Sequence, residues 1–368
     1  MWSPSSSFRH VLAILLVHIM LLEFPDVAET RNLASRSLTN STIPALFIFG
    51  DSTVDSGNNN YIKTIARSNF PPYGKDFPNH IPTGRFTNGK LLTDFLVSYA
   101  GIKDFIPPYL DPKLSLDDLK TGVCFASAGT GFDPLTAQIS DGVISMENQL
   151  NYFKEYKWRM ELYIGKESTR SLISKALFLI SAGTNDFIVN YYGPPIRKKT
   201  YTISAYQDFV LHLSQEFVQG LLNMGVRNIG FVGIPPIGCL PAIITLNSGD
   251  VVSRRGCIEW MSTVARSYNL LLQNILWAMQ NQGVNIKYLD VYKPVDDMIK
   301  NPQQFGFEKV NSGCCGSGLI ETSLLCNIRS SVCSDDSKYV FWDSVHPTEA
   351  AYYIIFQTVL PILNQFLY

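Results

Sequence analysis

Short apolar runs alternate with longer amphipathic stretches along this chain. The clearest apolar runs are Leu46–Phe49, Val123–Ala126, Ala176–Ile180, Asn228–Val232 and Asn285–Val291. Runs of this length, separated by segments with helical spacing, are typical of buried strands in a parallel sheet that is covered by helices. The pattern therefore predicts one α/β domain, and ligands of such sheets bind at the carboxyl ends of the strands.

Two long segments between these runs have apolar residues at helical spacing. They are Ala205–Gly225 and Thr263–Gly283, and each ends in a glycine that suits a helix C-cap before the next strand. A further helix is expected to begin at Pro347, because proline fits the first helical turn. Pro361 is expected to bend or end that helix. The strongly apolar face of this last segment is interpreted as core.

The N-terminal residues differ from the rest of the chain. Arg9 and His10 precede the apolar run Val11–Leu22, which is too short to span a bilayer but suits the core of a secretory signal peptide. A buried helix or an uncleaved anchor is the alternative interpretation. We expect cleavage between Ala28 and Arg31, and therefore secretion.

This interpretation divides the chain into three parts. We expect a signal peptide over residues 1–30, a polar segment over 31–43 and a single domain over 44–368. Asn40, in Asn-Ser-Thr, is the only N-glycosylation sequon and lies in the polar segment, so a glycan is expected there in a secreted protein.

The composition limits the classes of partner. The chain has 368 residues, of which 46% are hydrophobic and 17% charged, with a formal net charge of −1. A charge this close to zero gives no electrostatic reason to expect nucleic acid or an anionic membrane as a partner. The oligomeric state is left open.

The seven cysteines all lie after the predicted signal peptide. Cys239 and Cys257 flank a loop of ordinary length and are expected to form a disulfide, as secretion favours. Four others lie within twenty residues: Cys314, Cys315, Cys326 and Cys333. Two bridges are expected among these four, in one of three connectivities. A zinc site is the alternative, but adjacent cysteines fit the usual Cys-x2-4-Cys spacing poorly. The remaining Cys124 lies in an apolar segment and is expected to be buried and inert.

Ser52 follows the first apolar run directly, at the predicted end of a strand. A serine hydroxyl is a weak nucleophile until a neighbouring base removes its proton. Among the five histidines, His346 alone has an aspartate, Asp343, three residues before it. That spacing puts both side chains on one side of a turn, so Asp343 can orient the imidazole and His346 can activate Ser52. The other histidines are His10 and His18 in the signal segment, His80 in a loop and His212 in a helical segment.

Two further strands run into glycine turns that could supply an oxyanion hole. Gly129 follows Val123–Ala126, and a glycine there allows a substrate to approach backbone N–H groups closely. Asn185 follows Gly183 after another apolar run, and its side-chain amide could donate beside Ser52. The alternative is that both segments are simply tight turns.

These segments occur in the order of the four sequence blocks of the GDSL-type SGNH hydrolases. The first block is Phe49-Gly50-Asp51-Ser52-x-x-Asp55-x-Gly57-Asn58-Asn59, and the last is Asp343-x-x-His346-Pro347. Gly129 in its Ala-Ser-Ala-Gly turn and Gly183-Thr184-Asn185-Asp186 stand between them. The chain most resembles the plant secreted GDSL esterase/lipase group, over nearly all of residues 44–368.

The resemblance implies a three-layer α/β/α flavodoxin-like domain with a central parallel sheet. It also implies Ser52, Gly129, Asn185 and His346 as the four block residues and Asp343 as the acid of a triad. Two positions depart from the family pattern: Ala128 stands where relatives often have glycine, and Cys124 where they often have asparagine. Neither departure removes a catalytic group.

The function predicted from residues and resemblance together is a secreted carboxylic-ester hydrolase that acts through an acyl-enzyme, without metal or organic cofactor. Its partner is expected to be a small-molecule or lipid ester, with no nucleic acid and no stable membrane anchor. An acyltransferase that uses the same site is one alternative, and a non-catalytic binding protein on this scaffold is another. Aromatic residues of two long loops suggest an apolar acyl pocket: Phe70, Tyr73, Phe77, Phe86, Tyr191 and Tyr192.

Overall fold

A computed structural model describes residues 41–194, 196–247, 255–280 and 283–368, and the account below concerns these residues. The predicted signal segment, its cleavage site and the Asn40 sequon lie outside them. Four parallel strands form the central sheet, in the order β1 (Leu46–Gly50), β2 (Leu177–Ser181), β3 (Asn228–Val232) and β4 (Asn285–Leu289). The register places Phe49 of β1 beside Ile180 of β2. The prediction of a central parallel sheet is therefore confirmed.

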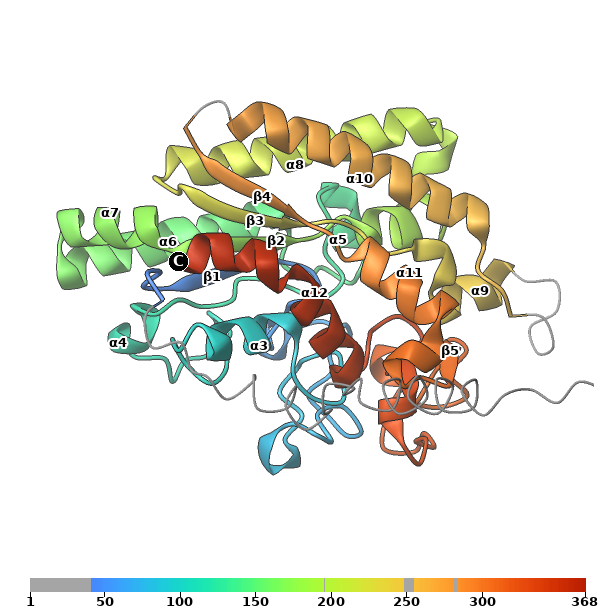
Figure 1. The fold of residues 1–368 in the computed structure, drawn as a ribbon. Helices are drawn as coiled ribbons and strands as arrows, with labels where there is room; N and C mark the ends of the chain where they lie inside the picture. The colour runs from blue at the N-terminus through green and yellow to red at the C-terminus, as the bar shows by residue number, and fades with distance from the viewer. Residues whose placement is uncertain (1–40, 195, 248–254, 281–282) are drawn as a thin grey trace, which may run out of the picture. The chain divides into compact units, whose positions relative to one another are not determined.

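Helices cover both faces of this sheet (Figure 1). The helices are α3 (Leu92–Tyr99), α4 (Leu116–Leu119), α5 (Pro134–Ile139), α6 (Met146–Ile164), α7 (Lys166–Lys175), α8 (Ile203–Asn223), α9 (Pro241–Asn247), α10 (Glu259–Gln280), α11 (Tyr292–Lys300) and α12 (Glu349–Leu367). Helices α8 and α10 lie over one face, and α3 and α12 lie over the other (Figure 1). Every residue of β1 and β2 is buried, as continuous apolar strands between two helical layers should be.

Smaller elements lie mostly in the loops at the carboxyl ends of the strands. A short second sheet pairs β5 (Lys309–Gly313) with β6 (Tyr339–Phe341) in parallel. Single 3-10 turns lie at Asn58–Tyr61, Pro78–His80, Arg197–Lys199, Ile237–Cys239, Pro302–Phe305, Ser323–Leu325 and Asp336–Lys338, and a π-helical turn at Asp186–Tyr191.

The segment Val123–Ala126 is not the regular strand that its apolar run predicts. It runs parallel to β1, where the Ile48 N–H donates to the Val123 carbonyl at 3.1 Å and the Phe125 N–H donates to the Ile48 carbonyl at 2.7 Å, but the bridge at Cys124 is isolated. The side-chain amide of Asn58 donates to the carbonyls of Cys124 and Ala126, at 2.8 Å each. A side chain therefore satisfies the carbonyls that a neighbouring strand would otherwise bind.

The C-terminal helix differs from its prediction at both prolines, Pro347 and Pro361. It begins at Glu349 and not at Pro347, because the hydroxyl of Thr348 accepts the Ala351 N–H at 3.2 Å and caps the helix. It also continues through Pro361 to Leu367, where a proline usually breaks a helix. Among the described residues α12 is the one helix long and apolar enough to cross a membrane. Its apolar face is nevertheless part of the hydrophobic core, as the sequence interpretation expects.

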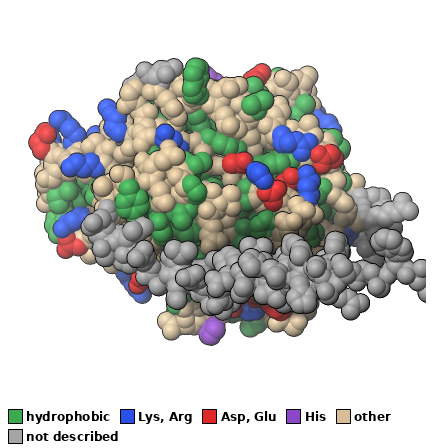
Figure 2. All heavy atoms as spheres, viewed as in Figure 1, with side chains coloured by type: hydrophobic (Ala, Val, Ile, Leu, Met, Phe, Trp, Pro, Cys, Tyr) green, Lys and Arg blue, Asp and Glu red, His purple; other side chains and the backbone are tan. Residues whose placement is uncertain are grey.

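Charged side chains of both signs alternate on the face that Figure 2 shows, most visibly over α11. Two ion pairs lie along this helix, between Lys293 and Asp297 and between Lys300 and Asp296. Apolar side chains are scattered between the charges and do not form one continuous stripe in this view. This face therefore has the mixed charge that a formal net charge of −1 suggests.

Candidate active site

Ser52 lies two residues beyond the end of β1, where the chain turns sharply at Gly50. Gly50 has a positive φ of 139°, and a Cβ atom there would lie 1.9 Å from the Ser181 carbonyl oxygen, so only glycine fits. The side chain of Gln149 holds this turn from α6, because its amide donates to the Gly50 carbonyl and accepts the Gly50 N–H, both at 2.9 Å. The turn presents Ser52 at the carboxyl edge of the sheet.

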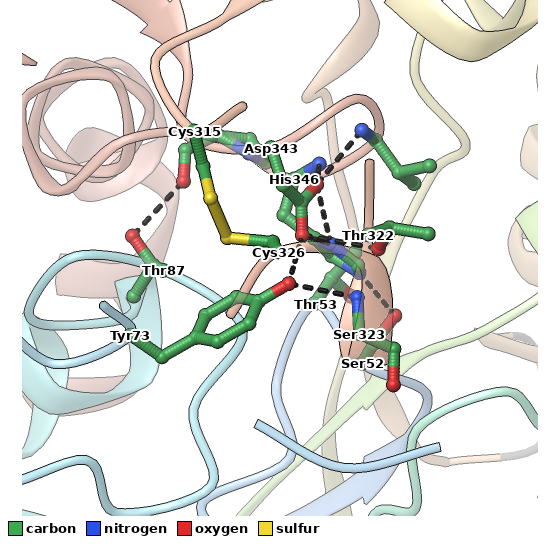
Figure 3. Close-up of polar contacts among 12 residues, drawn as sticks. Ser52, Thr53, Tyr73, Thr87, Cys315, Thr322, Ser323, Cys326, Asp343 and His346 are labelled. Atoms are coloured by element: carbon green, nitrogen blue, oxygen red, sulfur yellow. Dashed lines mark hydrogen bonds and ion pairs between the residues drawn. A yellow bond between two sulfur atoms is a disulfide. The ribbon is translucent and has the colours of Figure 1, made fainter. Parts of the chain in front are cut away.

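His346 connects Ser52 to Asp343 (Figure 3). Its Nε2 atom lies 2.8 Å from Ser52 Oγ, and its Nδ1 atom lies 2.9 and 2.8 Å from the two Asp343 oxygens. Ser52 is 7% exposed, His346 4% and Asp343 0%. Three side chains from distant parts of the chain thus form one buried, hydrogen-bonded line in which the serine is the most exposed member.

The spacing of Asp343 and His346 is built into a turn after β6. Asp343 Oδ1 accepts the N–H groups of Val345 at 2.8 Å and of His346 at 2.7 Å. These bonds fold the segment back on itself and bring both side chains to one side, as the sequence spacing predicts. Burial alone would raise the pKa of Asp343, but the charge of His346 and these hydrogen bonds hold it below its usual value. Asp343 is therefore an anion that can orient an imidazole.

The turn that carries Gly129 is fixed from the first sequence block. Asp55 accepts the Ala128 N–H at 2.9 Å, and the Asn59 side chain donates to the Ala128 carbonyl at 3.0 Å. Gly129 itself has a positive φ of 88°, a conformation that favours glycine. The Asn185 side-chain amide donates to the Thr130 carbonyl at 2.9 Å, which ties the third block to the same turn.

Hydrogen-bond donors remain at this edge of the sheet. Within the described part of the chain, the backbone N–H groups of Ser52 and Gly129 have no protein acceptor. The NH2 group of Asn185 has two hydrogens, and one protein acceptor is present for them. Donors of this kind can stabilise an oxyanion that forms next to a serine.

Comparison with known proteins agrees with this geometry. The family model described as GDSL-like Lipase/Acylhydrolase matches residues 46–359. The chain belongs to this family. It is 53% identical over 330 residues to the GDSL esterase/lipase At5g45960 of Arabidopsis thaliana, covering 89% of this chain and 88% of that protein. It is 42% identical over 348 residues to the GDSL esterase/lipase At1g06990 of the same plant, covering 94% and 96%. Membership makes the chain an ester hydrolase of the serine type.

The cysteines of this GDSL family member form three disulfides, Cys239–Cys257, Cys314–Cys333 and Cys315–Cys326. The expected disulfides are thus present, and they replace the zinc site that was the alternative. Cys124 is free and buried, and burial raises the pKa of its thiol to about 12. It is therefore the inert thiol that the sequence indicates.

The other histidines of the described chain lie outside this site. His80 is exposed in its loop, and His212 has an exposed side chain on α8, where it lies 3.4 Å from Glu216. Neither side chain forms a hydrogen bond with Ser52. The choice of His346 by elimination in the sequence agrees with where these side chains lie.

Sequence reasoning named Phe86 only as a possible pocket aromatic, and it gave no role to the neighbouring residues that hold the segment around His346. Phe86 packs against the His346 ring, with centroids 4.9 Å apart, and Thr87 donates to the Pro347 carbonyl at 2.9 Å. Asn88 accepts the Glu349 N–H at 2.8 Å at the start of α12. All three belong to Pro-Thr-Gly-Arg-Phe-Thr-Asn-Gly, residues 82–89. The density of glycine and polar residues in a loop was the available signal, but it does not say which distant segment the loop contacts.

An apolar pocket lies at the carboxyl ends of the strands, and it is lined by sequence neighbours of Ser52, Asn185 and His346 but by none of these three residues. Its wall includes residues adjacent to the candidate site: Thr53, Thr184, Val345 and Pro347. Deeper residues come from the strand ends and from helices: Ala182, Val232, Gly233, Val291, Val295, Tyr352 and Ile355.

The loop aromatics that the sequence suggested for an acyl pocket do not line this pocket. None of the six aromatic residues named from the sequence lines it, and its walls are mostly aliphatic. Tyr73 and Phe86 instead pack with Trp342 in a separate small core next to the disulfides. Aromatic residues in loops thus serve packing here, and the aliphatic strand ends supply the pocket.

Proposed function

We propose that this GDSL esterase hydrolyses carboxylic esters with Ser52 as nucleophile, His346 as general base and Asp343 as the acid that orients the imidazole. The observation that carries the proposal is the 2.8 Å contact between His346 Nε2 and Ser52 Oγ, together with the bond from His346 Nδ1 to Asp343. A base within 2.6–3.2 Å of a serine, oriented by a third group, is what nucleophilic catalysis requires.

In the proposed reaction Ser52 Oγ attacks the acyl carbon while His346 Nε2 takes its proton. The carbonyl oxygen becomes an oxyanion, which the N–H groups of Ser52 and Gly129 and the Asn185 amide stabilise. The intermediate collapses to an acyl-enzyme, and the leaving alcohol takes the proton from His346. Water then attacks the acyl-enzyme with His346 as base, and the carboxylic acid leaves. No metal or organic cofactor takes part.

The substrate is proposed to be an ester with an apolar acyl chain. Support comes from the apolar pocket, whose wall includes residues next in the sequence to Ser52, Asn185 and His346. An unbranched hydrocarbon chain would remove apolar wall from water, at about 25 cal/mol per Å² of buried area. Long-chain esters should therefore bind better than acetates.

We further propose that the enzyme is secreted, with residues 1–30 as signal peptide, 31–43 as a polar segment and 44–368 as the hydrolase domain. The three disulfides support an oxidising compartment, because disulfides persist mainly outside the cytosol. Asn40 would carry a glycan on that route. The extracellular space, with the cell wall as one candidate, is the proposed location.

The experiment that tests the catalytic proposal is labelling with a fluorophosphonate probe, which reacts with activated serines. The mature protein should be labelled, and Ser52→Ala should remove labelling and ester hydrolysis together. Ser56→Ala is a matched control, because Ser56 is a buried serine of the same block that lies outside the proposed triad. Labelling that persists in Ser52→Ala would reject Ser52 as the nucleophile.

A further inference from the structure

Asp343 is a fully buried carboxylate whose second oxygen is bound by side chains from two distant loops (Figure 3). Its Oδ2 atom accepts the Tyr73 hydroxyl at 2.7 Å and the Thr322 hydroxyl at 3.0 Å. The Oδ1 atom, in contrast, accepts N–H groups of its own turn. Apart from His346, then, Oδ2 depends on Tyr73 and Thr322 to compensate its burial.

The direction of the Tyr73 hydrogen bond is fixed by its second partner. The phenol oxygen accepts the Ser323 N–H at 2.9 Å, so its single hydrogen is directed to Asp343. Burial and the charge of Asp343 raise the pKa of Tyr73 well above its ordinary value, so the phenol stays a donor. The ring is 1% exposed and packs edge-on against Phe86, which in turn contacts His346.

Thr322 and Ser323 lie in a segment that a disulfide closes. Cys315 and Cys326 bracket this segment, and both are completely buried. The Ser323 hydroxyl donates to the Ile65 carbonyl, in the loop before Tyr73, at 2.8 Å. The disulfide therefore holds together the Thr322 hydroxyl, the Ser323 N–H and the loop that carries Tyr73.

We propose that Tyr73 and Thr322 are positioning residues for the triad acid, and that the Cys315–Cys326 disulfide holds them where they reach it. The inference rests on the proposed roles of Ser52, His346 and Asp343. Two donors on Oδ2 fix the rotation of the carboxylate and draw off part of its negative charge. Without them the carboxylate is less well oriented and carries more of its negative charge beside the imidazole.

Removing either donor should change the pH profile as well as the rate. Tyr73→Phe and Thr322→Val should each lower kcat about tenfold, the usual value of one hydrogen bond to a charged group. The acid limb of the kcat/KM profile should move up by about half a pH unit. Thr322→Ser keeps the hydroxyl, so its kcat and its acid limb should both match those of the wild type. Other titratable groups that act on the dyad, Asp51 and Tyr352, are unchanged in these variants.

A matched control separates positioning from packing. Tyr156 is a buried tyrosine whose hydroxyl donates to the Leu119 carbonyl at 3.1 Å, away from the triad. Tyr156→Phe should cost stability and leave the acid limb in place. If Tyr73→Phe and Thr322→Val also leave the acid limb and kcat unchanged, the positioning role is rejected.

The disulfide is tested by two double variants. Cys315→Ala with Cys326→Ala should lower kcat and move the acid limb upward, whereas Cys239→Ala with Cys257→Ala should leave the limb in place. Near-UV circular dichroism checks whether the first variant folds. If it does not fold, the pH profile is measured instead on wild-type protein in which the Cys315–Cys326 pair alone has been reduced and labelled. A folded variant with the wild-type limb would reject the role of the disulfide. If the fluorophosphonate probe labels Ser52 but the Tyr73, Thr322 and disulfide variants keep the wild-type kcat and acid limb, only the positioning inference fails. If labelling survives in Ser52→Ala, the catalytic proposal itself is rejected.

Discussion

Asp51 is a buried carboxyl group between the Gly50 turn and the nucleophile candidate Ser52. It is 1% exposed, and its Oδ1 atom accepts the Thr53 N–H at 3.0 Å and the Thr53 hydroxyl at 2.7 Å. Burial raises its pKa to about 6, against the opposing effects of Thr53 and the charge of His346. The residue thus destabilises the fold at neutral pH, while its negative charge favours a protonated imidazole nearby.

Asp51→Asn should make the protein more stable and less active at pH 8. In ordinary surroundings the carboxyl ionises near pH 3.8, but in the folded protein only near 6. The folded state therefore binds the extra proton between these values, and its stability falls as pH rises through that window. Asparagine keeps both Thr53 bonds and removes this loss. The gain should be near zero at pH 3.5 and about 3 kcal/mol above pH 7.

Urea unfolding at the two pH values, with intact disulfides, measures the difference. Hydrolysis of a soluble ester should fall several-fold in the same variant, since the imidazolium of the transition state loses a nearby charge. Asp208→Asn is the control, because Asp208 is an exposed aspartate on α8. A stability gain that is the same at both pH values would contradict the burial argument.

At the scale of elements, the strand ends and α11 form the apolar pocket. Val295 of α11 is 3% exposed and lines the pocket. Val295→Phe should fill part of the void, so hydrolysis of p-nitrophenyl esters should shift toward shorter acyl chains. Activity on the acetate should stay within about twofold, because the reacting groups are untouched and the extra ring costs only acyl-chain burial.

A second pocket supplies the control for this prediction. Leu213 of α8 lines it together with Phe132 and Leu150, and none of the three lines the pocket beside Ser52. Leu213→Phe should leave the chain-length profile as in wild type. If it shifts the profile and Val295→Phe does not, the acyl chain binds in the second pocket.

The elements themselves were largely predictable, and their contacts were not. Apolar runs located β1, β2 and β3 to within one residue, because strands buried on both faces must be continuously apolar. Helix α10 begins four residues before its predicted start, since helix boundaries depend on local caps more than on periodicity. The carbonyl of Cys124 accepts both the Asn58 side-chain amide and the Tyr109 N–H, and no local pattern indicates either contact.

The same contrast holds for the site. Ser52, His346 and Asp343 could be predicted as a candidate triad because histidine is rare and the Asp-His spacing is local, and the three side chains are hydrogen-bonded in the structure. Tyr73 was counted among possible pocket aromatics, although it contacts Asp343 from 270 residues away in the chain. Sequence reasoning detects groups that react, whereas groups that orient them through long loops require the folded chain.

At the scale of the whole molecule, the two ends of the described domain are joined. The Thr42 N–H donates to the Leu367 carbonyl at 2.9 Å, and its hydroxyl donates to the same oxygen at 3.1 Å. The last turns of α12 bury Leu363, Phe366 and Leu367 in the core. This burial explains why the helix continues past Pro361, since apolar contacts offset the backbone hydrogen bond that proline removes.

Deletion of residues 362–368 should therefore destabilise the domain strongly. Removing one buried leucine or phenylalanine side chain costs about 2–5 kcal/mol, and three are lost here, together with the Thr42 bonds. The melting temperature should fall by about 10 °C or more, or the protein should fail to fold. Deletion of Tyr368 alone, which is 53% exposed, should leave the melting temperature unchanged. If the C-terminus were instead a removable membrane tail, the longer deletion would keep the wild-type melting temperature and activity, and calorimetry of both truncated proteins decides between these outcomes.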